Sequence, residues 1–97
     1  MQPAEALATF IDAYVGAEHR ANPQRGCPIS TLANDLPRQG ARVRAAFDSC
    51  VECRSALSVA VLPQADPAAR RSLASSLVAE MAGAVALSRA VSDEALA

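Results

Sequence analysis

Hydrophobic residues recur every three or four positions along four stretches of the chain, which is the spacing of one face of an α-helix. The first stretch spans residues 3–15 and is followed by Gly16, a residue type that often lies just past a helix end. We predict a core-packing helix there, with Leu7, Phe10, Ile11, Tyr14 and Val15 on its apolar face. Tyr14 alone on that face has a polar tip, so it could also contact a ligand.

A short helix is predicted from Pro28 to Leu36, because proline suits the first helical position and Pro37 stops a helix. Cys27, just before it, is expected to be a small buried group rather than a reactive thiol. The preceding polar stretch, residues 17–26, contains the only histidine, His19. We expect His19 in a loop at the surface or at a helix end, because a single histidine makes neither a metal site nor a catalytic pair.

A long helix is predicted from Ala41 to Leu62, where Pro63 closes it. Arg54 falls inside its apolar stripe, and an unpaired buried charge is costly. We expect Arg54 either to pair with Glu80, within or between subunits, or to extend its guanidinium into solvent. The stripe consists of Val43, Ala46, Phe47, Cys50, Cys53, Leu57, Ala60 and Val61.

The last stretch, Asp66 to Val91, has a clear helix start, with Asp66 as the cap and Pro67 at the first helical position. Its two sides differ in character, and a chain of 97 residues has little else to cover both, so we interpret it as a subunit-interface helix. One side carries Leu73, Leu77, Met81, Ala84, Val85 and Val91, and the other carries Ser75, Ala79, Ala82, Gly83, Ala86 and Ala90.

The two long helices are joined by only residues 63–66, which predicts an antiparallel hairpin. Two such hairpins related by a two-fold axis would form a four-helix bundle and bury the surplus apolar faces. The fold class expected from the sequence is therefore all-α, as a single domain over residues 1–97 that forms a homodimer.

The composition of the chain argues against nucleic-acid binding, membrane insertion and secretion. Apolar residues make up 52% of the chain but aromatic residues only 3%, and the net charge is −1, so no basic field is present to hold nucleic acid phosphates. No uninterrupted apolar run reaches the length of a membrane span, and the N-terminus lacks the basic region of a signal peptide. Three cysteines fit free thiols in a reducing cytoplasm better than a disulfide framework.

Cys50 and Cys53 form a C-x-x-C pair, which is a redox or metal signature in other contexts. Here the pair lies in the middle of a predicted helix rather than at its N-terminus, and no histidine follows. Zinc would need further ligands that the chain lacks. We therefore predict no metal, no cofactor and no catalytic residue, and keep a small thiol redox protein as a minor alternative.

Three segments together resemble the C-terminal regulatory domain of TetR-family transcriptional repressors. They are residues 26–33 (GCPISTLA), residues 42–47 (RVRAAF) and residues 83–90 (GAVALSRA). The order and spacing agree from about Leu7 to Val91. The resemblance implies an effector-binding and dimerisation domain in which the last two helices form the dimeric four-helix bundle. It also implies that the DNA-binding helix-turn-helix is absent, so this polypeptide would reach DNA only through a missing N-terminal domain.

The function expected from this resemblance is dimerisation and small-molecule sensing in a transcriptional repressor, with no enzymatic activity. The alternative is a helical interaction module, such as a heterodimerising partner or an anti-repressor, which would need the same interface and no pocket. Candidate contacts to a small apolar effector are Phe10, Tyr14, Leu32, Phe47 and Val51. Candidate interface residues are Cys53, Leu57, Leu73, Leu77, Met81, Gly83, Ala84 and Leu87.

Overall fold

A computed structural model describes residues 3–97, and all its regular elements are helical, which confirms the predicted all-α fold class. The α-helices are α1 (Pro3–Val15), α2 (Ala17–Ala21), α3 (Pro28–Leu32), α4 (Ala41–Val61) and α5 (Pro67–Ala90). Two short 3-10 helices, η1 (Pro23–Arg25) and η2 (Leu36–Arg38), lie in the connections.

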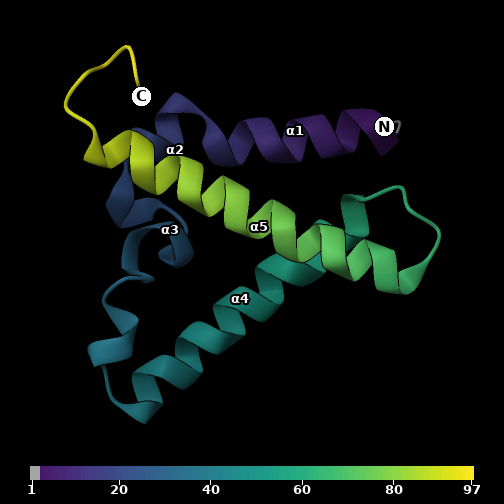
Figure 1. Cartoon of the computed structure of the whole chain (residues 1–97), viewed down its shortest axis with the longest axis horizontal. Helices are drawn as coiled ribbons and strands as arrows, with labels where there is room; N and C mark the ends of the chain where they lie inside the picture. The colour runs from purple at the N-terminus through teal and green to yellow at the C-terminus, as the bar shows by residue number, and fades with distance from the viewer. Residues whose placement is uncertain (1–2) are drawn as a thin grey trace.

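Helix α5 crosses the middle of the molecule, with α1 along one side and α4 on the other (Figure 1). The chain reverses between α4 and α5 as predicted, but the two helices then diverge instead of running side by side, and α3 lies between their separated ends (Figure 1). The molecule measures 38 × 37 × 19 Å, so it is about two helix diameters thick. In a body this thin, each long helix keeps one face at the surface.

The start of α5 follows the sequence prediction. The Asp66 carboxylate accepts a hydrogen bond from the Ala69 backbone N–H at 3.2 Å, which satisfies one of the free donors of the first turn. In the same turn, Arg70 donates from Nε to the Gln64 carbonyl at 2.7 Å. These two bonds fix the angle at which the chain leaves the α4–α5 connection and enters α5.

The core is built along one stripe of α5, where every third or fourth residue is buried. Two clusters share it: Met81 and Val85 pack with Tyr14 of α1, and Val78 and Ala82 pack with Ile29 of α3. This stripe lies between the two sides that the sequence pattern distinguished, and it takes residues from both. The buried residues of α5 are Ala74, Val78, Met81, Ala82 and Val85.

Small side chains lie at the buried positions where α4 and α5 meet. Ser58 is fully buried in α4 and Ala74 is 1% exposed in α5. Ser58 keeps its hydroxyl satisfied within its own helix, because Oγ donates to the Arg54 carbonyl at 2.9 Å. Small residues at these positions permit the two helices to approach closely before they diverge.

Two local predictions were wrong. Residues 17–21 form helix α2 rather than a loop, and α3 ends at Leu32 rather than continuing to Leu36. After Leu32 the chain turns, with the Asp35 N–H bonded to the Leu32 carbonyl at 2.9 Å. Leu36 is buried and begins η2, so Pro37 lies inside a 3-10 turn, where its missing N–H costs nothing, instead of stopping a helix.

By length and mean hydropathy α5 could cross a membrane, which the sequence pattern had not suggested. Within the described residues, its buried stripe packs against α1, α3 and α4. A core helix of a soluble protein has the same length and composition, so this property of α5 is weak support for a membrane span.

Candidate ligand cavity and interface

A cavity of about 510 Å³ opens between α1, α2 and α4, within the range of small-molecule sites. Its walls combine apolar and polar groups from segments far apart in the sequence. The lining residues are Thr9, Phe10, Ala13, Tyr14, Glu18, His19, Asn22, Arg25, Gly26, Cys27 and Arg54.

Arg54 of α4 holds its guanidinium over two aromatic rings in this cavity. Its Cζ atom lies 5.0 Å from the centroid of Tyr14 and 5.6 Å from that of Phe10, both within cation–π range. Among residues 3–97 no carboxylate forms an ion pair with Arg54, so the predicted pairing with Glu80 inside one subunit is wrong. The side chain is half-buried and turned onto the rings of α1 rather than extended into solvent.

Tyr14 lines the cavity and belongs to the core beneath it. The residue is 5% exposed, and its hydroxyl oxygen has no hydrogen-bond partner of acceptable geometry within the described part of the chain. Burial, with the nearby Cys27 thiol as a further cause, raises the pKa of Tyr14 to about 12, against smaller opposing effects of Ser30 and Arg54. The phenol is therefore neutral at physiological pH and does not neutralise Arg54.

His19 has a structural position that the sequence did not reveal. Its Nδ1 bonds to the Tyr14 carbonyl and its Nε2 accepts from the Cys27 N–H at 2.8 Å. Because a carbonyl only accepts and an amide N–H only donates, the ring is the neutral tautomer protonated on Nδ1. The ring also packs edge-to-face on Tyr14, with centroids 4.7 Å apart. His19 thus joins α1 to the start of α3, and both its nitrogens are occupied.

The backbone at Gly26 passes directly over this histidine. A Cβ atom at Gly26 would lie 2.7 Å from His19 Nε2, which is too close, and 3.1 Å from an Arg89 nitrogen, which is a tight contact that a small shift would relieve. The backbone conformation of Gly26 itself is an ordinary extended one, so the requirement for glycine is one of space. The glycine of the GCP segment therefore permits the close approach of the α3 start to α2.

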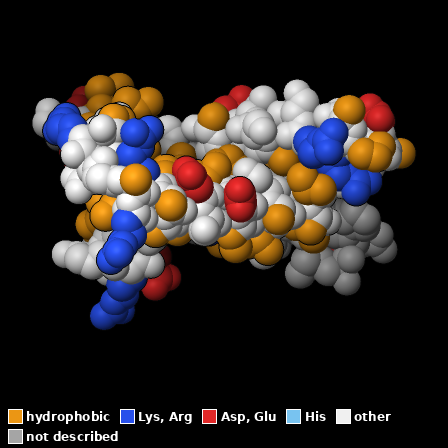
Figure 2. Space-filling model, turned by 90° about the horizontal axis from the view of Figure 1, so that it is seen from below, with side chains coloured by type: hydrophobic (Ala, Val, Ile, Leu, Met, Phe, Trp, Pro, Cys, Tyr) orange, Lys and Arg blue, Asp and Glu red, His pale blue; other side chains and the backbone are white. Residues whose placement is uncertain are grey.

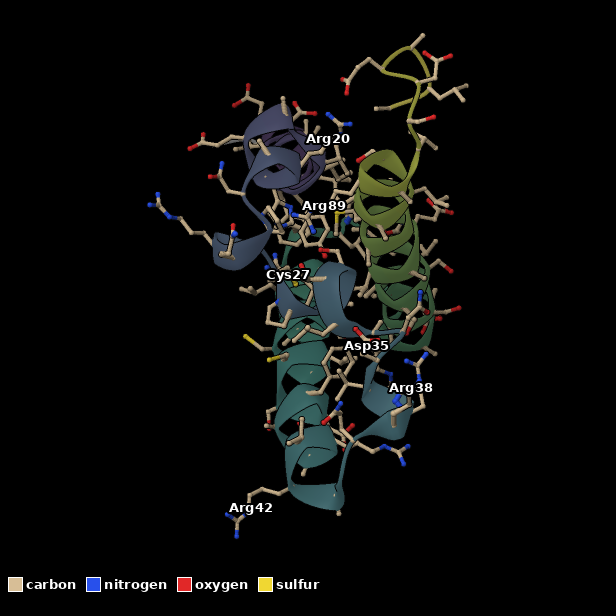
Figure 3. All side chains as sticks on the ribbon, turned by 90° about the vertical axis from the view of Figure 1, so that its left-hand side faces the viewer. Arg20, Cys27, Asp35, Arg38, Arg42 and Arg89 are labelled. Carbon is tan, nitrogen blue, oxygen red and sulfur yellow. The ribbon has the colours of Figure 1, made fainter. Side chains whose placement is uncertain are left out.

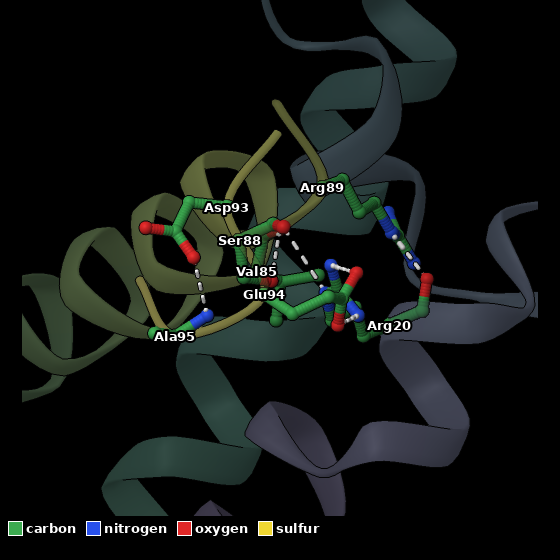
Figure 4. A network of polar contacts seen from close by, with 7 residues as sticks. All are labelled: Arg20, Val85, Ser88, Arg89, Asp93, Glu94 and Ala95. Atoms are coloured by element: carbon green, nitrogen blue, oxygen red, sulfur yellow. Dashed lines mark hydrogen bonds and ion pairs between the residues drawn. The ribbon is translucent and has the colours of Figure 1, made fainter. Parts of the chain in front are cut away.

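Two arginines fasten α2 to the end of α5 (Figures 3 and 4). Arg89 donates to the carbonyls of His19 at 2.6 Å and Arg20 at 3.0 Å, and to the Thr31 hydroxyl at 3.1 Å. These carbonyls belong to the last turn of α2, where the His19 carbonyl also accepts from the Asn22 N–H at 3.3 Å. Figure 3 shows Arg20 and Arg89 on the same side of the molecule, whereas Arg42 projects away from the start of α4.

The predicted ligand contacts fall in different places. Phe10 and Tyr14 line the cavity. Phe47 and Val51 instead pack against the cluster of Ile29, Val78 and Ala82, and Leu32 is 44% exposed away from the cavity. The polar residues that line the cavity were not predicted from the sequence, and Arg54 is the most important of them. Its position within an apolar stripe was the one sequence signal that could have indicated its role.

A second, smaller cavity of about 320 Å³ lies between the start of α3 and the middle of α4. Arg54 and Cys27 line it as well, so these two side chains form the wall between the two cavities. Cys50 and Cys53 contribute to it from the middle of α4, and no group of three potential metal ligands occurs in the described residues. The other lining residues are Pro28, Ser49 and Leu57.

Most of the predicted interface residues lie at the surface of the single chain. Leu57 is 48% exposed and Leu87 is 68% exposed, values that are high for leucine. Met81 differs: it is 3% exposed and packs on Tyr14, so its side chain has little surface to present to a second subunit. Cys53, Leu73 and Ala84 are exposed, and Leu77 is half-buried. The space next to Gly83 is open, because a Cβ atom built there would have no described atom within 4 Å.

The edge of the molecule on which α4 lies is shown in Figure 2. Hydrophobic side chains lie in separate patches along it, acidic side chains lie between them near the middle, and basic side chains gather toward its two ends. This face is therefore of mixed apolar and charged character and not a continuous apolar patch.

Comparison with protein families gave a match over residues 3–96 to the model described as transcriptional regulator LmrA/YxaF-like, C-terminal domain, one of the TetR C-terminal families. The chain belongs to this family. Comparisons with curated proteins and with solved structures gave no match.

Membership of the TetR C-terminal family confirms the resemblance found in the sequence and gives the domain a regulatory role in ligand binding and dimerisation. It points to a regulator rather than an enzyme. The matched region contains the whole of α1 to α5, so the cavity and the exposed faces of α4 and α5 all lie inside the TetR C-terminal domain.

Proposed function

We propose that this TetR C-terminal domain forms a homodimer through the exposed faces of α4 and α5, and that its cavity binds a small-molecule effector. The domain acts by dimerisation and sensing and does not itself contact DNA. The proposal rests on the family, on the surface of the two long helices and on a cavity of suitable size.

The outward face of α5 carries this proposal. We define it as Leu73, Ser76, Glu80, Ala84 and Leu87, which recur at helical spacing and are all exposed. Glu80 is the only charged residue from Ser72 to Ser88. A helix face that remains in water normally carries several charges, so a face this apolar favours burial against another protein surface.

A second copy of the chain fits this face better than an unrelated partner does. The neighbouring helix α4 also exposes apolar side chains, Leu57 and Cys53 among them, so two copies related by a two-fold axis would each supply the same pair of helix faces. Small residues at Gly83 and Ala84 would permit close helix approach. Glu80 would then meet the partner subunit, and an ion pair between subunits stays a prediction.

The position of Arg54 connects the two parts of the function. Its side chain lines the effector cavity and also the second cavity, which extends along α4 to Leu57. A ligand that moves Arg54 would therefore act on the helix that carries the interface. Any such coupling is reciprocal, so dimerisation would change effector affinity by the same factor.

Labelling of Cys53 tests the interface and the thiol alternative together. Cys53 is exposed in the single chain, and it lies on the surface that the dimer would cover. We expect the wild-type chain to be labelled slowly at Cys53 at high protein concentration and quickly after dilution. The variant Leu87→Glu should be labelled quickly throughout, with Ala8→Glu on exposed α1 as the matched control.

Fast labelling of Cys53 at every concentration would contradict the proposed interface. If labelling is fast and Cys50 and Cys53 also form a reversible disulfide under mild oxidant, the thiol function is favoured instead. If the chain is instead an interaction module that pairs with a different subunit, Cys53 should be labelled quickly when the chain is by itself. Labelling should become slow once a full-length regulator of this family is added.

A further inference from the structure

We propose that the cavity selects a small organic anion, a compact acid group such as a carboxylate attached to an apolar body, and that Arg54 is the group that recognises the charge. This inference rests on the proposed function, since it takes the cavity as the effector site. It goes further by assigning a chemical class to the ligand and a role to one residue.

The first observation is that Arg54 forms no ion pair with any carboxylate in the described part of the chain, although it is half-buried. The ion pairs formed among residues 3–97 are Arg20 with Glu94 and Arg38 with Asp35, and neither includes Arg54. Removing a guanidinium from water is unfavourable unless something replaces its hydration, and the two rings do so only in part. An anionic ligand would supply the missing partner, with two parallel hydrogen bonds to the guanidinium fork.

The second observation is the balance of charge around the cavity. Its lining contains two arginines, Arg25 and Arg54, against one carboxylate, Glu18, while the chain as a whole carries −1. Arg25 and Glu18 are exposed at the rim, whereas Arg54 lies deeper, on the aromatic rings. His19 contributes no free donor because both its ring nitrogens are engaged. The inner part of the cavity is therefore positive.

The third observation is the apolar wall next to that charge. Phe10, Ala13 and the ring of Tyr14 form a continuous hydrophobic surface along α1, beneath the guanidinium. Tyr14 is protonated at neutral pH, as a tyrosine with its ordinary pKa also is, so it places no negative charge beside an incoming acid. A ligand with its acid group on Arg54 would lay its apolar portion on this wall.

The chain provides its own reporter for the test, because Tyr14 is its only tyrosine and it has no tryptophan. Tyrosine emission of the 97-residue chain would be titrated with cyclohexanecarboxylate and, separately, with the neutral isostere cyclohexanecarboxamide. We expect the carboxylate to bind about tenfold more tightly than the amide, a preference that added salt reduces. Arg54→Met should reduce the preference to less than about twofold, whereas Arg44→Met on an exposed part of the same helix should preserve it.

Far-ultraviolet circular dichroism shows whether Arg54→Met keeps its helices. If it does not, Arg54→Lys serves instead, since it keeps the charge but loses the planar fork, and an intermediate preference is expected. Equal affinity of the wild-type chain for acid and amide would overturn the anion inference and leave the sensing function standing. No change in Tyr14 emission with either compound would overturn both.

Discussion

The Nε atom of Arg89 donates to the Arg20 carbonyl at 3.0 Å, and the Nε atom of Arg20 donates to the carbonyl of Ser88, beside Arg89, also at 3.0 Å (Figure 4). Each arginine thus caps the last turn of the helix that carries the other, where free carbonyls and the negative end of the helix dipole favour a cation. This exchange joins residues almost seventy positions apart in the chain and closes the end of α5 onto α2.

Loss of the Arg89 side chain should therefore destabilise the fold. Arg89→Met keeps much of the aliphatic length but removes the Arg89 donor from the Arg20 carbonyl and leaves the His19 carbonyl with only the Asn22 N–H, so we expect a loss of about 2–3 kcal/mol in the free energy of unfolding. Urea titration followed by circular dichroism measures it. Arg71→Met is the control. Arg71 lies at an exposed position of α5, so its loss should change stability by less than about 0.5 kcal/mol.

The outer ion pair of the same network should contribute little. Glu94 has an 83% exposed side chain and lies 3.4 Å from Arg20, so Glu94→Gln should cost no more than about 0.5 kcal/mol in the same titration. A loss as large as that of Arg89→Met would show that the C-terminal segment, not the backbone capping, holds α2 in place.

Gly26→Ala tests the close approach over His19. The added methyl would meet the imidazole ring at 2.7–2.8 Å, so the ring must move and its bond to the Cys27 N–H weaken. We expect a loss of about 1–3 kcal/mol in the free energy of unfolding. Gly40→Ser, at a site with nothing within 4 Å of its Cβ, should change stability by only a few tenths of a kcal/mol. Equal effects of the two substitutions would contradict the steric role of Gly26.

Tyr14 should make stability fall at high pH. Its folded-state pKa is about 12 and that of an unfolded tyrosine is about 10, so above pH 10 the unfolded chain binds fewer protons than the folded one. The contribution is fully present below pH 10 and is lost between pH 10 and 12. All nine basic residues of the chain are arginines, so no lysine titrates in this window.

The matched variant is Tyr14→Phe. It removes the titrating group and a buried hydroxyl that has no hydrogen-bond partner among residues 3–97, so stability at pH 7 should be unchanged or slightly higher, and the decline between pH 10 and 12 should become shallower. Unfolding by urea at a series of pH values measures both. An equally steep decline in the phenylalanine variant would show that another group causes it.

Local sequence signals predicted the two long helices well. Asp66 and Pro67 mark the start of α5, and Pro63 follows the end of α4, because capping and proline geometry depend only on neighbouring residues. Helix α2 could not be predicted in this way. It spans five residues, too few to show a hydrophobic period or to be stable alone, and it is held by hydrogen bonds from Arg89, far along the chain.

The buried face of α5 was predicted less well. The sequence pattern weighted the larger residues Leu73 and Leu77, but the fold buries Ala74 and Val78 beside them. The reason is that Val78 packs on Ile29 of α3 with Phe47 and Val51 of α4 beside it, and the hydrophobic period of one helix does not show where other helices will pack on it. Arg54 shows the same limit, because its place on the rings of Phe10 and Tyr14 depends on how α1 crosses α4.

The central claim is that the exposed faces of α4 and α5 join two copies of this chain, and sedimentation equilibrium over a wide range of concentration tests it most directly. We predict twice the mass of one chain for the wild type and for Ala8→Glu, and the mass of one chain for Leu87→Glu, which places a charge at the most exposed leucine of α5. A wild-type chain that keeps the mass of a single chain at every concentration would contradict the claim.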